Sequence, residues 1–280
     1  MNIHTQWRLK LAHNLSKPLS RFPGVRAIVA AGSAARNYAD GYSDLELIFY
    51  WDKEPADQLK NDISTLLNAD HRYPEAHFAY HSALVIDGFP VDIWHKTTSV
   101  EEESIASVID NCSTDLDASN IVDTMRFCIP LYGSEFIQPW KERIESYPPE
   151  LTERFFKEYL PHFHLRHIYF ESKRDNPIAF YNMLSNIHCS LFIILLALNK
   201  SHFPTYKWIY KRLGELPLKP ENIEIRLRNM YKAKPQIAVE QLCDLLAETL
   251  TLIETHHPDF DTSSARQELM QPMPKTFDPE

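Results

Sequence analysis

Short apolar runs alternate with helical patterns in the first half of the chain. Four of these runs are rich in Val, Ile, Phe and Tyr and are bounded by Gly, Pro or Asp, as β-strands are. They are VRAIVAAG (25–32), DLELIFYW (44–51), HFAYHSALVI (77–86) and FPVDIWH (89–95). Apolar residues recur at helical spacing in four further segments, 4–15, 55–69, 100–111 and 119–128. These patterns predict an α/β unit with a small mixed sheet.

The pattern changes after YPPE (147–150), where two prolines mark a boundary. Beyond it nearly every segment has helical periodicity, and prolines separate the segments. The predicted helices cover 150–174, 177–199, 205–213, 220–231 and 235–255. We therefore expect an α+β chain: an α/β domain over 1–146, an all-helical bundle over 147–260, and a partly disordered tail over 261–280.

Two carboxylates stand at the start of the second predicted strand. Alternation places Asp44 and Glu46 on the same face of that strand, which is otherwise apolar. Buried acids are costly unless they are paired or bind a metal. A third acid, Asp92, lies in the predicted strand 89–95. If the two strands are neighbours, three hard oxygen ligands converge, and such ligands suit Mg²⁺ beside a substrate phosphate.

Gly32 and Ser33 lie between the first strand and a predicted short helix, SAARNYA. A turn of this kind presents backbone N–H groups and the positive end of a helix dipole to an anion. Glycine allows close approach of the backbone, and the serine hydroxyl adds a donor. The sequence thus combines a phosphate-binding turn with a group of acids.

GSAARNYADGYSDLE followed by VDIW resembles the DNA polymerase β-type nucleotidyltransferase superfamily over residues 27–94. The helical second half resembles the aminoglycoside and lincosamide nucleotidyltransferases and related uncharacterised bacterial members. The resemblance implies a catalytic domain over 1–146 and a helical domain over 147–260 that shapes the cleft for nucleotide and acceptor. One departure is Asn37, where many members have glycine; asparagine tolerates left-handed backbone angles better than most residues.

The resemblance also implies roles for individual residues. Gly32 and Ser33 would hold the triphosphate, with help from Ser43. Asp44 and Glu46 would hold Mg²⁺. Asp92 would be either a third metal ligand or the general base.

Two residues of the helical half receive roles from the same resemblance. Lys207 would reach the phosphates, and Tyr231 would flank the nucleotide. The implied cofactors are two Mg²⁺ ions, with Mn²⁺ as an alternative, and the implied nucleotide substrate is ATP.

The resulting hypothesis is the transfer of AMP from ATP to a hydroxyl of a small molecule, such as an aminoglycoside-like antibiotic. Two alternatives stay open: adenylylation of a protein or RNA, and nucleotide binding without transfer. Each residue also has a purely structural interpretation. The two strand acids could be surface charges of an edge strand, Asp92 a turn acid and Ser33 a helix cap. Lys207 could be solvated, and Tyr231 could pack within the bundle.

Composition narrows the class of protein. The net charge of −9 disfavours a protein that coats nucleic-acid phosphates. No run reaches about 18 apolar residues, so we expect no membrane span and read 189–200 as a core helix. The N-terminus lacks a signal-peptide pattern, so we expect a cytoplasmic protein. The resemblance leaves both a monomer and a homodimer open. The histidines of HFHLRH (162–167) are expected to line a cleft or pack between domains rather than to bind zinc.

Overall fold

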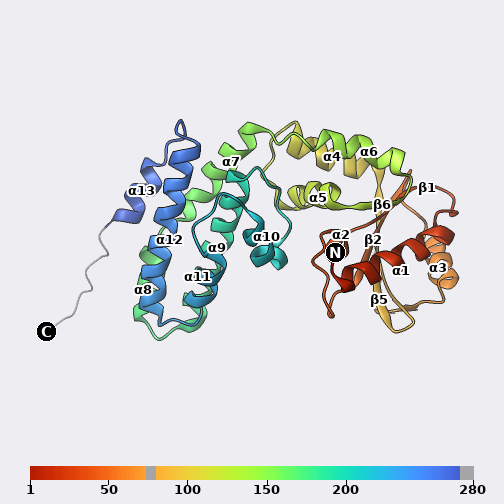
Figure 1. Ribbon diagram of the computed structural model, residues 1–280, viewed down its shortest axis with the longest axis horizontal. Coiled ribbons are helices and arrows are strands. Elements are labelled where there is room, and N and C mark those ends of the chain that lie inside the picture. The colour runs from red at the N-terminus through yellow and green to blue at the C-terminus, as the bar shows by residue number, and fades with distance from the viewer. Residues whose placement is uncertain (74–79, 272–280) are drawn as a thin grey trace. The chain divides into compact units, whose positions relative to one another are not determined.

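The computed structural model describes residues 1–73 and 80–271. The chain forms two compact units, Met1–Ser146 and Tyr147–Glu280, which we call the sheet unit and the helical unit. The fold is α+β: a mixed sheet with helices, followed by an all-helical region. Figure 1 labels the elements.

The sheet unit is built on a six-stranded sheet with the order β3-β4-β5-β2-β1-β6. Its strands are β1 (Val25–Ala30), β2 (Leu45–Trp51), β3 (Asp70–His71), β4 (His81–Ile86), β5 (Phe89–Thr97) and β6 (Ile129–Tyr132). The central pair β2 and β5 is parallel. The other four pairs are antiparallel. The parallel pair places the starts of β2 and β5 at the same edge of the sheet.

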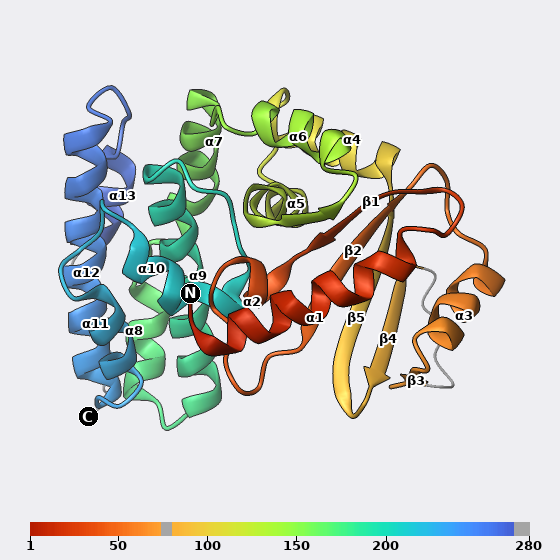
Figure 2. The same ribbon diagram turned by 45° about the vertical axis from the view of Figure 1, so that its right-hand side comes forward.

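One face of the sheet carries the main core of this unit. Alternate residues of β2, namely Leu45, Leu47, Phe49 and Trp51, are fully buried on that face. They pack with α1 (Ile3–Leu19) and α3 (Asp57–Leu66), and Figure 2 shows α1 lying across the sheet. Burial of large side chains is the main stabilising contribution to such a core.

The opposite face packs against α4 (Thr98–Ile109) and α6 (Ser134–Arg143), with α5 (Leu116–Phe127) beside α4. Tyr50 from β2 donates a hydrogen bond to the buried Glu101 of α4 over 2.8 Å. Lys96 donates to the other oxygen of Glu101 over 2.9 Å. The Tyr50 ring also meets Trp140 of α6 edge-on at 5.2 Å. Glu46 precedes Ile48 and Tyr50 on this face.

The predicted strands and helices of the first half are present, with shifted ends. The fourth strand extends to Thr97. The third begins at His81, because Tyr80 lies in a turn; residues 77–79 of its prediction lie outside the described residues. The sequence pattern did not predict β3, β6 or α6. The two strands are short edge strands, and α6 contains Pro139 inside it. Neither feature gives a clear periodic signal.

The helical unit contains α7 (Pro149–Tyr159), η1 (Leu160–His162), α8 (Arg166–Lys173), α9 (Pro177–Leu198), η2 (Tyr206–Trp208), α10 (Ile209–Glu215), α11 (Ile223–Met230), α12 (Pro235–His256) and α13 (Ser263–Met270). The prediction of a single helix over 150–174 is wrong, because the segment forms α7, η1 and α8. It breaks after Tyr159, because Pro161 has no N–H to continue the helical ladder.

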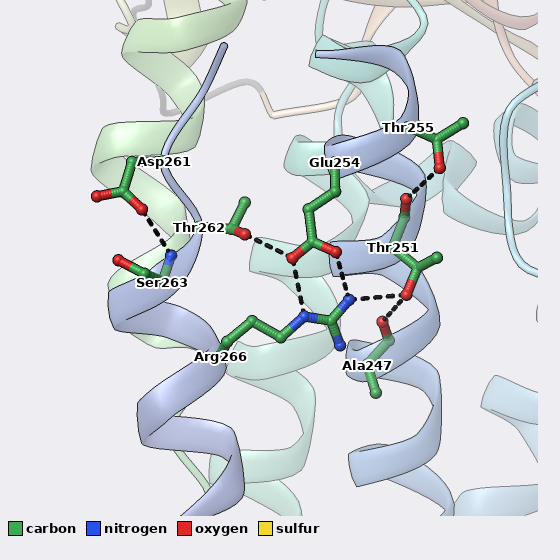
Figure 3. A network of polar contacts seen from close by, with 8 residues as sticks. All are labelled: Ala247, Thr251, Glu254, Thr255, Asp261, Thr262, Ser263 and Arg266. Atoms are coloured by element: carbon green, nitrogen blue, oxygen red, sulfur yellow. Dashed lines mark hydrogen bonds and ion pairs between the residues drawn. The ribbon is translucent and has the colours of Figure 1, made fainter. Parts of the chain in front are cut away.

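Part of the predicted tail is also helical. In α13, Leu269 is buried, and Arg266 makes a two-pronged ion pair with Glu254 of α12, with distances of 2.8 Å (Figure 3). Thr262 donates to the same carboxylate over 2.6 Å. These contacts hold residues 263–270 in place, whereas 272–280 lie outside the described residues.

Helix α9 alone, among the described residues, is long and apolar enough to cross a membrane. In its most apolar 18-residue window, 67% of the residues are buried inside the protein. Its buried side chains include Phe192 and the run from Ile193 to Leu198. This burial is that of a central helix of the bundle, as predicted for 189–200.

Candidate active site

Gly32 occupies the turn that leaves β1. Its φ of +59° lies in the left-handed region that favours glycine. A Cβ at this position would overlap the carboxylate of Glu46. The structure therefore brings together two of the predicted site residues, and it explains why no larger side chain fits at residue 32.

Ser33 and Asn37 complete the turn. Ser33 is buried within α2 (Gly32–Ala35), and its carbonyl accepts a hydrogen bond from the Tyr38 N–H over 2.9 Å. Asn37 has a φ of +59°, so asparagine takes the left-handed angle here, as expected. Its side-chain oxygen accepts from the Asn2 N–H over 2.9 Å. The turn is thus closed without the glycine that the resemblance would place at residue 37.

Arg36 links the same turn to α5. Its guanidinium donates to the Gly32 carbonyl over 3.2 Å. It also donates twice to Asp123 of α5, over 3.0 and 2.6 Å. Both side chains are almost fully buried. This pair was not predicted from the sequence, because its members lie 87 positions apart.

Glu46 and Asp92 are direct neighbours across the parallel pair β2 and β5. Residues in register on neighbouring strands project from the same face. This confirms that the strands carrying the predicted acids lie side by side. Asp44 precedes β2 by one residue, and its carbonyl accepts from Arg8 of α1 over 3.2 Å.

Asp92 is buried beside two basic side chains. Its Oδ1 lies 3.1 Å from Nη2 of Arg72 and 3.1 Å from Nε2 of His81. Both contacts are within ion-pair distance, but neither has the angles of a hydrogen bond. The His81 ring stacks on Trp94 at 4.3 Å. The charge of Asp92 is therefore compensated by Arg72. The hydrogen-bonding capacity of Oδ1 of Asp92 and Nη2 of Arg72 is not fully used.

Arg72 and His81 were not predicted as site residues. His81 lies in a predicted strand, and pairing of its neighbour Ala83 with Asp92 places both on the Asp92 face. That pairing could have been inferred from the short turn Asp87–Gly88 between β4 and β5. Arg72 gave no signal, since it follows a two-residue strand.

Ser43 shapes the loop before Asp44. Its hydroxyl donates to the Asp40 carboxylate over 2.9 Å and accepts from the Asp40 N–H over 3.0 Å. The bond from the Ser43 hydroxyl, followed by one from the Tyr42 N–H, lowers the pKa of the Asp40 carboxyl. The Ser43 carbonyl accepts from the buried Arg8 over 3.1 Å. Ser43 and Arg8 together set the direction in which the chain enters β2.

The acids have the oxygen chemistry of a magnesium site. Across residues 1–73 and 80–271, however, no group of three or more His, Cys, Asp or Glu side chains is arranged to hold a metal ion. Asp44, Glu46 and Asp92 do not make up such a group as placed, and Asp92 contacts Arg72 and His81. Metal binding by these residues stays a prediction.

Lys207 and Tyr231 belong to the helical unit. The Lys207 ammonium lies 5.1 Å from the centre of the adjacent Trp208 ring. Tyr231 stacks on Tyr181, and its hydroxyl lies 3.2 Å from Nδ1 of His188 on α9. Both have local packing partners, and their roles toward a nucleotide stay predictions.

Comparisons with known proteins add little to these observations. No protein family profile and no curated protein matches the chain. Among solved structures, the chain is similar to a nucleotidyltransferase-like protein from Exiguobacterium sibiricum 255-15. The identity is 9%, the match covers 94% of this chain and 78% of that chain, and the TM-score is 0.42. At this level of similarity, an assignment of activity rests on the residues of the site.

Proposed function

We propose that the protein is a nucleotidyltransferase that moves a nucleoside monophosphate, AMP from ATP, to a hydroxyl of a small molecule. The observation that carries the proposal is the contact between the Gly32 turn and Glu46, with Asp92 beside Glu46 in register. A turn able to receive phosphate and two adjacent carboxylates thus occupy one edge of the sheet.

Each residue of the site has a task in this proposal. The backbone at Gly32 and Ser33 would bind the triphosphate, because that turn lets an anion approach the N–H groups closely. Ser43 would support this binding through the loop that it shapes. Glu46 and Asp92, with Asp44, would hold Mg²⁺. When bound, Mg²⁺ would supply charge neutralisation at the phosphates and lower the pKa of a bound hydroxyl.

Asp92 keeps both of its predicted roles, metal ligand and general base. Arg72 compensates the charge of Asp92, so a metal ion held by Asp92 would compete with Arg72 for the same carboxylate. Lys207 and Tyr231 would supply phosphate and nucleobase contacts from the helical unit. The acceptor class in this proposal is a hydroxyl-bearing small molecule; an aminoglycoside-like compound is one example.

The experiment is transfer from α-labelled ATP to a panel of hydroxyl compounds, with and without Mg²⁺. We expect Asp92→Asn and Glu46→Gln each to reduce transfer by about a hundredfold or more, the loss typical when charge stabilisation is removed. Asp87→Asn is the matched control. Asp87 lies in the exposed turn beyond β4 with a φ of +50°, which asparagine tolerates. Wild-type transfer in both site variants would refute the assignment.

The ion-pair distance between Asp92 and Arg72 favours one second candidate, a protein that binds ATP without transferring it. A carboxylate held by arginine is less available to a metal. Binding of labelled ATP without pyrophosphate release, over the whole acceptor panel and with Mg²⁺ or Mn²⁺, would support this candidate over the first.

A further inference from the structure

The helical unit contains a cavity of about 520 Å³ that is lined only by residues of that unit. This volume is within the usual range for small-molecule sites, about 300–1,000 Å³. The residues come from α7, η1, α8, α9 and η2 and from the break after η1. Among them are Tyr159 and Tyr206, the histidines His162, His164 and His167, and Asn186.

The lining combines an apolar floor with aromatic and neutral polar groups. Ile168, Ile187 and Ser190 are buried, whereas His162 and Tyr206 reach solvent. Nδ1 of His162 lies 2.8 Å from the Ser190 hydroxyl. Such a mixture, mostly apolar with a few fixed polar groups, is typical of sites for small ring-bearing ligands.

The charges around the cavity restrict the ligand further. The lining residues, all within the described part of the chain, include no Asp, Glu, Lys or Arg. Three imidazoles are the only side chains there that can become charged positively. A cationic ligand would therefore lose hydration without gaining a carboxylate partner, which is unfavourable.

We propose that this cavity binds a small aromatic molecule that carries no positive charge. The aromatic side chains Tyr159 and Tyr206 would contact its rings, and Ile168, Met183 and Ile187 would contact its apolar edge. Asn186, Ser190 and the histidines would offer hydrogen bonds. The proposal does not rest on the proposed transfer reaction and can hold if that reaction fails.

The binding experiment uses two probes that share one ring system and differ in charge. They are 2-naphthalenemethanol, which is neutral, and 2-naphthylmethylammonium, which is cationic. Binding to the full-length protein is followed by saturation-transfer NMR at pH 7.5. We expect the neutral probe to bind at least ten times more tightly than the cation. Equal binding of both probes, or of neither, would overturn the proposal.

Two cysteines locate the bound probe. Cys189 lines the cavity, and Cys243 does not; both are partly exposed, and burial raises the pKa of both thiols. Labelling with iodoacetamide, read by mass spectrometry, reports each thiol separately. We expect saturating neutral probe to slow labelling of Cys189 at least fivefold and to leave Cys243 unchanged. Equal slowing of both thiols, or of neither, would place the probe elsewhere.

A matched pair of variants tests the site without touching its floor. Asn186 and Asn182 are exposed, lie one turn apart on α9 and share a hydrogen bond of 3.3 Å, but only Asn186 lines the cavity. We expect Asn186→Trp to weaken binding of the neutral probe at least tenfold and Asn182→Trp to leave it within twofold. Because both positions are exposed, both variants should fold, which circular dichroism would verify. An unchanged affinity in Asn186→Trp would overturn the assignment.

Discussion

At the scale of single residues, the candidate site depends on contacts that tolerate no extra volume and on one buried ion pair. Gly32 faces the Glu46 carboxylate, and Arg36 ties the Gly32 carbonyl to Asp123. The first contact joins the Gly32 turn to Glu46, and the second joins the same turn to α5. Each of these two contacts leads to a separate prediction about the free energy of unfolding.

Gly32→Ala should destabilise the protein by more than its left-handed angle alone would explain. Gly88→Ala is the control, because Gly88 also has a positive φ, +79°, but has open space around it. The backbone strain common to both should cost about 1–3 kcal/mol. The overlap with Glu46 should add about 1–3 kcal/mol to Gly32→Ala only. Urea unfolding measures both values.

The double variant Gly32→Ala with Glu46→Ala removes the overlapping carboxylate. Relative to Glu46→Ala alone, its added alanine should cost no more than Gly88→Ala does. If the added cost equals that of Gly32→Ala in the wild-type background, the contact with Glu46 is not the cause.

Breaking the Arg36–Asp123 pair from one side should be strongly destabilising. Arg36→Met leaves Asp123 buried without its arginine, and such a loss typically costs about 3–5 kcal/mol. Replacing both, with Arg36→Met and Asp123→Leu, should cost less than Arg36→Met alone, because no buried charge of the pair remains. Thermal and urea unfolding at pH 7 compare the variants. A double variant less stable than Arg36→Met would contradict this account.

At the scale of elements, sequence patterns predicted the long, regular segments best. The strands 44–51 and 89–95 were predictable because their alternation and composition agree, and with them the placement of Glu46 and Asp92. The break at Pro161 was missed because apolar spacing continues across it. Arg8 and Arg72 were missed for another reason: each contacts the site from a distant segment, and a single sequence carries no signal for such contacts. Arg36 lies in the Gly32 turn, but its partner Asp123 is 87 positions away.

Helix α13 should loosen in acid. Hydrogen bonds from Arg266 lower the pKa of Glu254 to about 2, below its unfolded value near 4.5. The stability that the pair contributes is therefore complete above about pH 4.5 and is lost as pH falls toward 2. Hydrogen exchange of residues 263–270, corrected for intrinsic rates, should rise over this range.

Glu254→Gln should remove most of that pH dependence and raise exchange at pH 6. A part will remain, because the bond from Ser263 also lowers the pKa of Asp261. Glu268→Gln is the control on α13, and it should behave like the wild type. Exchange that stays constant between pH 5 and 2.5 in the wild type would contradict the role of this ion pair.

At the scale of the whole molecule, each compact unit contains a buried, neutral histidine. In the sheet unit, burial lowers the pKa of His95 to about 3, with further lowering by Lys60 and His81. In the helical unit, burial lowers the pKa of His188 to about 4. Protonation of either ring is therefore unfavourable in the folded state.

Stability should fall as pH drops below about 6.5. Below pH 6.5 the histidines of the unfolded chain take up protons, whereas those of the folded protein stay neutral until pH 3 to 4. The contribution of each neutral histidine to stability is therefore complete above the unfolded pKa and is lost as pH falls toward the folded pKa. His188→Asn and His95→Gln should each flatten the decline of the unfolding free energy between pH 6.5 and 4.5. Exposed His13→Asn serves as control. A decline as steep as that of the wild type in both variants would show that other groups cause it.

The parallel pairing of β2 with β5 has a consequence for synthesis of the chain. Glu46 and Asp92 come from opposite sides of a segment that includes α3, β3 and β4. A nascent chain that has not yet emerged to residue 92 can form the β1–β2 pair and the Gly32 turn, but it lacks Asp92, the second member of the acid pair. Until β5 docks, β2 is an exposed strand edge that could pair with another chain. The step that completes the candidate site is thus also the step that protects the growing sheet from association.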